Sequence, residues 1–287
     1  MSQESLAHIR IVLVEPAGPL NIGSAARVMK NFGLQHLVLV NPHCNPLGEE
    51  ALQMAVHAKD LLQQAQVVDS IPAALDGCYS AIATTARPRD INTPLEPPEQ
   101  ALPSLLKPTQ QSQQSTRALI FGPEDRGLSN EELIHAQRFV KISTSPTYSA
   151  LNLAQAVAIC CYELYRAAET ISQLEQLELS APSDSAQNLT KTRRTTPLSV
   201  KQTESHLPNA ESDSLPSNQA KLNELEGYYQ HLESVLLLVE YLYPHTAASR
   251  MRKVRQLLQR ASPTSAEVAL LRGMLRQVEW ALSKDQP

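Results

Sequence analysis

A long polar stretch divides this chain and limits how it can fold. Residues 167–220 form 54 consecutive positions without an aromatic residue or a glycine, and 27 of them are Ser, Thr, Gln, Asn or Pro. Such a segment buries too little apolar surface to offset the conformational entropy lost on folding. We therefore expect a disordered linker over 167–220, although the leucine pattern of 171–179 allows the preceding helix to extend into it. The chain then consists of a domain over 1–166, this linker, and a smaller unit over 221–287.

The final unit carries a charge that the whole-chain average hides. The net charge is −4, from 25 basic and 29 acidic residues, and by itself this value argues against a nucleic-acid partner. Between Pro244 and Arg276, however, the sequence contains seven Lys or Arg residues and one acidic residue, Glu267. Apolar residues at helical spacing, interrupted by Pro244 and Pro263, predict about three helices here. A solvated helical surface is one interpretation, and phosphate binding by the clustered arginines is the other.

Several classes of protein are disfavoured by the composition. No run reaches the roughly 18 apolar residues of a membrane span, and the polar start over residues 1–8 is unlike a signal peptide. The four cysteines contain no Cys-x-x-Cys pair, and the eight histidines lack metal-ligand spacing. We therefore expect a soluble, cytoplasmic protein with no metal site and no membrane contact.

The first 166 residues alternate between short apolar runs and helical patterns. This alternation predicts an α/β fold, with a mostly parallel sheet covered by helices. In such sheets, ligands bind in the loops that follow the carboxyl ends of the strands. The expected strands are 9–14, 37–40, 66–68, 79–83, 118–121 and 139–142, and the expected helices are 22–32, 51–65 and 151–166.

Four loops at this predicted edge contain candidate ligand-binding residues. In the first, over 15–27, Asn21 is expected to cap the following helix. The second places Arg87 and Arg89 on either side of a proline, which suits an anion site. The third, over 121–132, has a capping-box pattern, and the fourth, over 143–154, is polar. Each loop alone is compatible with an ordinary surface turn, but four on one edge predict a binding site. No Gly-x-Gly-x-x-Gly, Walker or Gly-x-Ser-x-Gly motif is present.

Three of these loops carry motifs that resemble a known family. They are Asn21-x-Gly23-x-x-Ala26-Arg27, Phe121-Gly122-x-Glu124-x-x-Gly127-Leu128-Ser129 and Tyr148-Ser149-Ala150-Leu151-Asn152-Leu153. In order and spacing, across about residues 8–166, they are similar to the three motifs of the SpoU branch of SPOUT methyltransferases. Thr84-Thr85-Ala86-Arg87-x-Arg89 and the segment from Val254 to Leu275 further resemble the TrmJ subgroup of that branch.

The resemblance implies a fold and a reaction. It implies a parallel sheet with helices on both faces, a trefoil knot in the C-terminal part of the domain, and a small α-helical extension. It also implies a homodimer, the cofactor S-adenosylmethionine, and methylation of the ribose 2'-hydroxyl of nucleotide 32 (C or U) in the tRNA anticodon loop. Another RNA position, in tRNA or rRNA, and a catalytically silent RNA-binding relative are the alternatives. The implied cofactor-binding residues are Thr84, Thr85, Ala86, Phe121, Gly122, Glu124, Gly127, Leu128, Ile142, Ser149, Leu151 and Asn152.

Arg27 is the residue that we expect to be central to the reaction. In the family the first-motif arginine acts in the active site of the neighbouring subunit; here Asn21 and Glu124 are expected to hold it, with Ser149 and Asn152 lining the site. A guanidinium has a pKa above about 12 and is a poor base. We therefore expect Arg27 to clamp a phosphate and stabilise the developing alkoxide. The predicted RNA-binding residues are Arg27, Arg87 and Arg89 at the anticodon loop, and Arg250, Arg252, Lys253, Arg255 and Arg260 at the tRNA body.

One position departs from the family pattern. Many relatives have Ser-Ser-Leu-Asn in the third motif, whereas this chain has Ser149-Ala150-Leu151-Asn152. Ala150 removes a hydroxyl near the expected cofactor and ribose. Ser149 is the neighbouring hydroxyl that could replace it.

Overall fold

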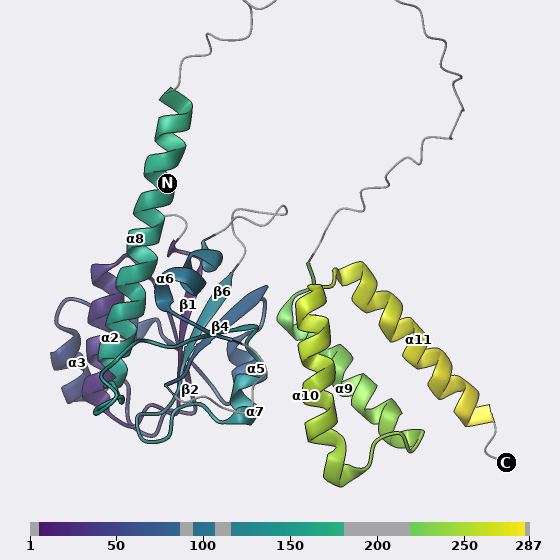
Figure 1. Ribbon diagram of the computed structural model, residues 1–287. Helices are drawn as coiled ribbons and strands as arrows, with labels where there is room; N and C mark the ends of the chain where they lie inside the picture. Colours follow the sequence, from purple (N-terminus) through teal and green to yellow (C-terminus); the bar gives the residue numbers. More distant parts are fainter. Residues whose placement is uncertain (1–5, 87–93, 107–115, 181–218, 285–287) are drawn as a thin grey trace, which may run out of the picture.

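The apolar runs of the first domain form a seven-stranded parallel sheet. The computed structural model describes residues 6–86, 94–106, 116–180 and 219–284 (Figure 1). The sheet order is β3-β2-β1-β6-β4-β7-β5, and every neighbouring pair is parallel. The strands are β1 (Ile9–Val14), β2 (His36–Val40), β3 (Gln66–Val68), β4 (Ser80–Thr84), β5 (Leu95–Glu96), β6 (Arg117–Phe121) and β7 (Arg138–Val140).

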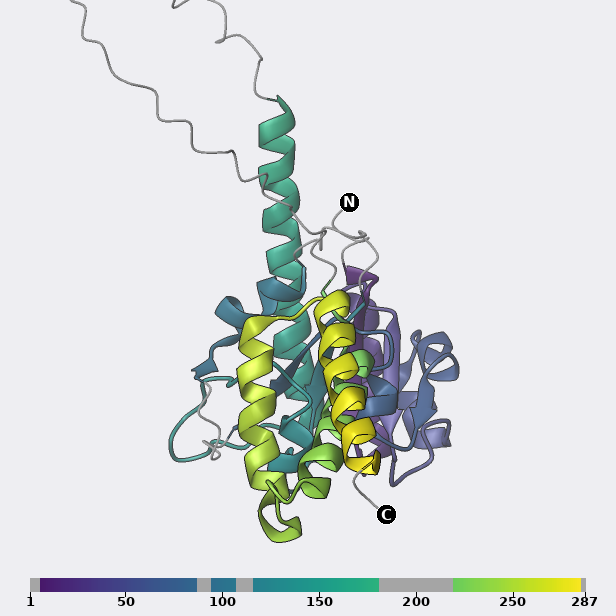
Figure 2. The same cartoon turned by 90° about the vertical axis from the view of Figure 1, so that its right-hand side faces the viewer.

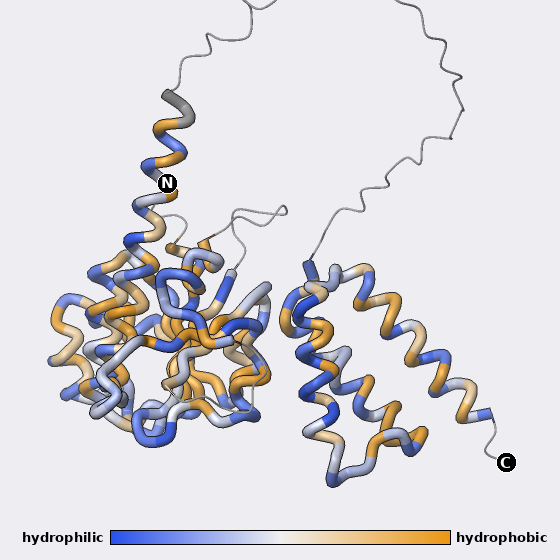
Figure 3. The backbone as a smooth tube through the Cα atoms, in the orientation of Figure 1, coloured by the Kyte–Doolittle hydropathy of each residue, from blue (hydrophilic) through white to orange (hydrophobic). Residues whose placement is uncertain are grey.

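Helices cover both faces of this sheet because its central strands are apolar on both sides. In β1, Ile11 and Leu13 enter one core, whereas Val12 and Val14 enter the other. The first core is closed by α2 (Pro19–Asn31), α3 (Glu49–Ala55), α4 (Lys59–Gln63), α6 (Pro98–Ala101), the 3-10 helix η1 (Leu102–Leu105) and α8 (Leu153–Ser180). The second core is closed by α5 (Ile71–Ala74) and α7 (Asn130–Leu133). Figure 3 shows these apolar segments gathered inside the domain.

Three local predictions need correction. The helix expected over 51–65 is two helices, because Val56 adopts a φ of 53° and ends α3. Asn21 does not cap α2: the helix begins two residues earlier, at Pro19, with Gly18 as its N-cap. The last predicted strand, 139–142, is β7 and ends at Val140, and the sequence did not indicate β5 or α6.

The predicted three-helix tail is confirmed. It consists of α9 (Leu222–Leu238), α10 (Pro244–Ala261) and α11 (Ser265–Lys284), around a core that includes Tyr228, Tyr229 and Met251. Helix α8 continues past residue 166 to Ser180, as its leucine pattern allowed. The rest of the predicted linker, residues 181–218, lies outside the described residues. None of the helices in the described ranges combines the length and apolar character that crossing a bilayer requires.

The tail packs against the second face of the sheet domain, beside α5 and α7 (Figures 1 and 2). The backbone amide of Leu222 donates to the carbonyl of Cys78 over 2.8 Å. The side chain of Asn223 donates to Asp76 over 2.8 Å, and that of Gln259 donates to the carbonyl of Ile134 over 3.1 Å. Hydrogen bonds from both α9 and α10 therefore attach the tail to the domain.

Candidate active site

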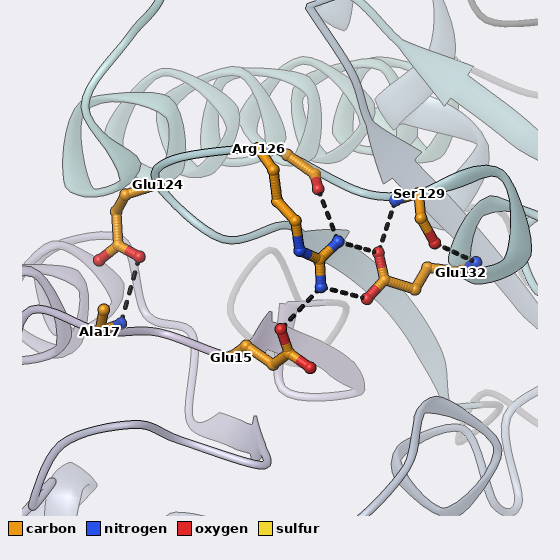
Figure 4. Close-up of polar contacts among 7 residues, drawn as sticks. Glu15, Ala17, Glu124, Arg126, Ser129 and Glu132 are labelled. Carbon is orange, nitrogen blue, oxygen red and sulfur yellow. Dashed lines mark hydrogen bonds and ion pairs between the residues drawn. The ribbon is translucent and has the colours of Figure 1, made fainter.

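A chain of hydrogen bonds joins the three motifs. The amide Nδ2 of Asn21, in the first turn of α2, donates to Oε1 of Glu124 over 2.8 Å. Asn152, just before α8, donates through its Nδ2 to Oδ1 of Asn21 over 2.9 Å. The backbone amide of Ala17 also donates to the Glu124 carboxylate, over 3.2 Å (Figure 4). The backbone amide of Gly18 donates to the same carboxylate over 3.3 Å. Asn21 thus connects Glu124 to Asn152, using its amide nitrogen for one and its oxygen for the other.

These contacts control the ionisation of Glu124. Its partial burial would raise the pKa of the carboxyl group, but the hydrogen bonds from Asn21, Ala17 and Gly18 hold that pKa below its ordinary value. The carboxylate is therefore negatively charged at neutral pH. It serves as a fixed acceptor that orients Asn21 and the amino end of α2.

A second polar cluster fixes the loop that carries Glu124. Arg126 binds Glu132 through two hydrogen bonds, of 2.8 and 2.9 Å, and Glu15 through a third of 2.7 Å (Figure 4). Glu132 also completes the predicted capping box with Ser129, which is confirmed. Glu15 directly follows β1, so Arg126 ties the loop after β1 to the loop after β6. Sequence analysis did not identify Arg126, because a single arginine in a loop has no distinguishing pattern.

Most of the predicted cofactor-binding residues line one cleft beside these loops. The exceptions are Leu128, which is buried, and Asn152, which belongs to the hydrogen-bond chain. The cleft residues that were predicted are Thr84, Thr85, Ala86, Phe121, Gly122, Glu124, Gly127, Ile142, Ser149 and Leu151. The cleft is also lined by Pro123 and Ala150, which lie in the predicted cofactor loops, and by residues that were not expected there: Asp125, Arg126, Val140, Leu153 and Ala156.

The wall of this cleft is backbone where the glycines of the second motif lie. A Cβ atom on Gly122 would lie 2.4 Å from the backbone nitrogen of Leu128, so no side chain fits there. Gly127 has a φ of 64°, a conformation that favours glycine. The loop consequently folds back on itself and presents peptide groups to the cleft.

Arg27 lies apart from the hydrogen-bond chain. It is exposed on α2, and within the residues that the structure describes its guanidinium has no hydrogen-bond or ion-pair partner. Asn21 and Glu124 bind each other and not Arg27 of the same protomer, so the expectation that they hold the first-motif arginine stays a prediction. Arg27 remains available to a ligand or to another molecule.

The predicted RNA-binding residues of the tail fall into two groups. Arg250, Lys253 and Arg260 are exposed on α10, and Arg252 is half-buried. Arg255 is buried against Glu226, and this pairing removes it from the predicted phosphate-binding set. Arg87 and Arg89 lie outside the described residues. Among the residues that are described, no three His, Cys, Asp or Glu side chains gather as a metal site.

Comparison with known proteins places this arrangement in a family. Residues 8–162 match the model of the SpoU rRNA methylase family, which covers more than half of the chain. The chain therefore belongs to the SpoU family of methyltransferases, and its fold is that of the SPOUT enzymes. Residues 223–287 match a second model, the C-terminal domain of the tRNA methyltransferase TrmJ.

Relatives of similar length agree with both matches. The tRNA (cytidine/uridine-2'-O-)-methyltransferase TrmJ of Cronobacter sakazakii is 37% identical over 275 residues, covering 96% of this chain and 97% of the relative. The Klebsiella pneumoniae protein of that name is 35% identical over 274 residues, covering 96% and 97%. The crystal structure of TrmJ from Z. mobilis ZM4 superposes with a TM-score of 0.71 at 30% identity, covering 94% of this chain and 98% of that one.

Proposed function

We propose that this protein transfers a methyl group from S-adenosylmethionine to the ribose 2'-hydroxyl of nucleotide 32, C or U, in the anticodon loop of tRNA. The observation that carries the proposal is the match of both parts of the chain, the catalytic domain and the tail, to relatives named tRNA (cytidine/uridine-2'-O-)-methyltransferase. The TrmJ-type tail argues against a SpoU enzyme with another RNA target. The intact Asn21–Glu124–Asn152 chain argues against a catalytically silent relative.

The cleft suits the cofactor. An adenosyl group needs an apolar surface together with backbone polar groups, and the methionyl part needs polar partners. Val140, Ile142 and Leu151 supply the apolar surface, and the folded-back loop at Gly122 supplies the backbone. Glu124 and Ser149 supply polar atoms on the same wall. In this proposal the cleft loops belong to a trefoil knot.

The protein's own groups position the ribose and stabilise charge. When bound, S-adenosylmethionine supplies a methyl group activated by its sulfonium. Arg27 clamps a backbone phosphate and stabilises the developing alkoxide, while the proton passes to that phosphate or to water. Asn21 and Glu124 act by fixing the first turn of α2 relative to the cleft, and Ser149 lines the target side.

The exposed position of Arg27 supports a homodimer. Leu20 lies on the same exposed face of α2, and the neighbouring α8 exposes Ile159 and Tyr162, whose ring packs edge-on against Phe32. A second copy covering this face would bury these apolar side chains. It would also bring Arg27 of one protomer to the cleft of the other. Each active site would then be completed by the neighbouring subunit.

The proposed domain organisation follows the described helices. The catalytic domain includes α8, and a linker joins it to the basic tail, which contacts the tRNA. Because its substrate is tRNA, we place the protein in the cytoplasm.

One assay tests the function. The protein is incubated with S-adenosylmethionine and an unmodified tRNA transcript, and methylated nucleosides are mapped by mass spectrometry. A methyl group on the ribose of nucleotide 32 is the expected result. Methylation elsewhere would select another SpoU-type target, and tight RNA binding without methylation would select a silent relative.

The role of Arg27 is tested separately. Arg27→Lys keeps the positive charge but loses the bidentate fork, so kcat should fall by about 100-fold. Near-normal turnover with normal tRNA binding would contradict the role.

A further inference from the structure

The turn between α9 and α10 exposes an unusual group of side chains. Tyr241 is 62% exposed and Tyr243 is 52% exposed. The ring of Tyr243 stacks on that of His245 at 6.0 Å with an interplanar angle of 21°. The guanidinium of Arg250 lies 5.7 Å from the centre of the Tyr241 ring. We call Tyr241, Tyr243, His245 and Arg250 the tyrosine turn.

The backbone of the tyrosine turn is held in place from inside. Leu242, between the two tyrosines, is buried in the tail core, and its amide donates to the carbonyl of Leu236 over 2.9 Å. Arg250 donates to the carbonyl of Tyr241 over 3.1 Å. Because the intervening residue points inward, both tyrosine rings are presented outward from an anchored loop.

The rings of Tyr241 and Tyr243 lie outside the core of the tail. The chain has 12 aromatic residues in 287, and the tail already uses Tyr228 and Tyr229 in its core. Two exposed tyrosines within three residues therefore leave apolar area uncovered, and exposed aromatic rings with arginine beside them are typical of surfaces that stack unpaired bases.

The residues around the tyrosine turn favour binding of a phosphate group. A hollow beside Tyr241 is lined by Leu236, Leu242 and Met251, and the cations Arg250 and Lys253 also line it. One carboxylate, Glu240, precedes the turn. An apolar hollow next to an exposed ring and two cations matches a nucleotide, whose base is flat and apolar on its faces and whose phosphate is anionic.

The position of the turn is compatible with the catalytic cleft. Figures 1 and 2 show the α9–α10 connection at the same end of the molecule as the start of α8 and the loop before it, which line the cleft. A single RNA can therefore contact both surfaces from one side.

We propose that the tyrosine turn binds an unpaired nucleotide of the RNA substrate. Its base stacks on Tyr241 or Tyr243, and its phosphate contacts Arg250 and Lys253. The identity of this RNA rests on the proposed function. In addition to contacting phosphates, the tail would then recognise a single-stranded part of the RNA.

The test compares binding of three RNA probes without methyl transfer. The probes are the tRNA transcript, a single-stranded oligouridine and a blunt RNA duplex, and the variants are Tyr241→Ala, Tyr243→Ala and Tyr241→Phe. Leu257→Ala, at another exposed apolar residue on α10, is the matched control. Loss of a stacking contact should raise Kd for tRNA and oligouridine by roughly 10-fold. We expect this rise in Kd in at least one of the two alanine variants, with no change in their affinity for the duplex. Tyr241→Phe and Leu257→Ala should bind all three probes with near-normal affinity.

Salt dependence separates stacking from charge. The alanine variants should keep the slope of log Kd against log salt, whereas Arg250→Ala should reduce it by about one. An equal loss for the duplex would overturn the proposal in favour of phosphate contact alone. Unchanged Kd for every probe would overturn the proposal. Binding is measured independently of methylation, so failure of the proposed reaction would be seen separately in the mass-spectrometric assay.

Discussion

Arg255 and Glu226 form a partly buried, bidentate ion pair inside the tail, with hydrogen bonds of 2.5 and 2.8 Å. The guanidinium also lies 4.4 Å from the centre of the Tyr229 ring. Burial would raise the pKa of Glu226, but Arg255 outweighs this effect and the pKa lies below its ordinary value. The most central arginine of the basic segment is therefore structural.

Replacing Arg255 should destabilise the tail. Arg255→Ala leaves the partly buried Glu226 carboxylate without its bidentate cation, which costs about 3 kcal/mol. The free energy of unfolding, measured by urea titration with circular dichroism, should fall by that amount. Arg260→Ala, at an exposed position of the same helix, should change it by less than about 0.5 kcal/mol. Equal stabilities of the two variants would contradict the structural role.

The lowered pKa of Glu124 predicts a pH-dependent contribution to stability. A carboxyl group with a depressed folded-state pKa stabilises the protein above its ordinary value of 4.5, and this contribution is lost as the pH falls through the folded-state pKa. The Tm of the wild-type protein should exceed that of Glu124→Gln at pH 7. The difference should shrink below about pH 4.5. A difference that stays constant down to pH 3 would show that the carboxylate charge is unimportant.

Arg126 should affect cofactor binding more than RNA binding. Arg126→Lys keeps a charge but replaces the fork, whose two Nη atoms make three bonds to Glu15 and Glu132, with a single ammonium nitrogen, so the loop bearing Glu124 should lose its fixed position. We expect about a 10-fold rise in Kd for S-adenosylmethionine, measured by calorimetry, with unchanged affinity for tRNA. Lys59→Ala, on the exposed surface of α4, serves as the control. Parallel losses of both affinities would indicate general unfolding instead.

Two glycines should respond in opposite ways to alanine. Gly122→Ala places a methyl group 2.4 Å from the Leu128 nitrogen, so the cleft wall must open and cofactor affinity should be lost. Gly273→Ala, inside α11 with no atom near the new methyl group, should stabilise the protein by about 0.5–1 kcal/mol. Thermal unfolding and cofactor titration of both variants check the pair. Wild-type cofactor affinity in Gly122→Ala would contradict the tight packing of the loop.

Local patterns predicted the parts of this molecule that depend on local physics. The apolar runs predicted six of the seven strands of the described sheet. The central strands β1 and β6 gave the clearest runs, because a strand buried on both faces must be almost continuously apolar. The Ser129–Glu132 capping box and the proline at the start of α10 were equally visible. The two-residue strand β5 is too short to leave a pattern.

Properties that depend on tertiary contacts were not predictable in this way. The Asn21–Glu124 bond joins residues 103 positions apart, and the helix-cap rule gave Asn21 a local role instead. Counting positive charges in α10 could not separate the inward-facing Arg255 from the outward-facing Arg250. The end of α3 at Val56 could not be predicted, because neither a glycine nor a proline marks it in the sequence.

The backbone bond between Leu222 and Cys78 has a consequence for selectivity. It anchors the first residue of α9 directly to the catalytic domain, so the spacing between the cleft and the tyrosine turn is set by the folded body. Two weak contacts on one rigid body reinforce each other when an RNA can reach both at once. An RNA of the wrong dimensions gains only one of them. The enzyme would then select RNA molecules in which the target ribose and the unpaired nucleotide are separated by the distance between the cleft and the tyrosine turn.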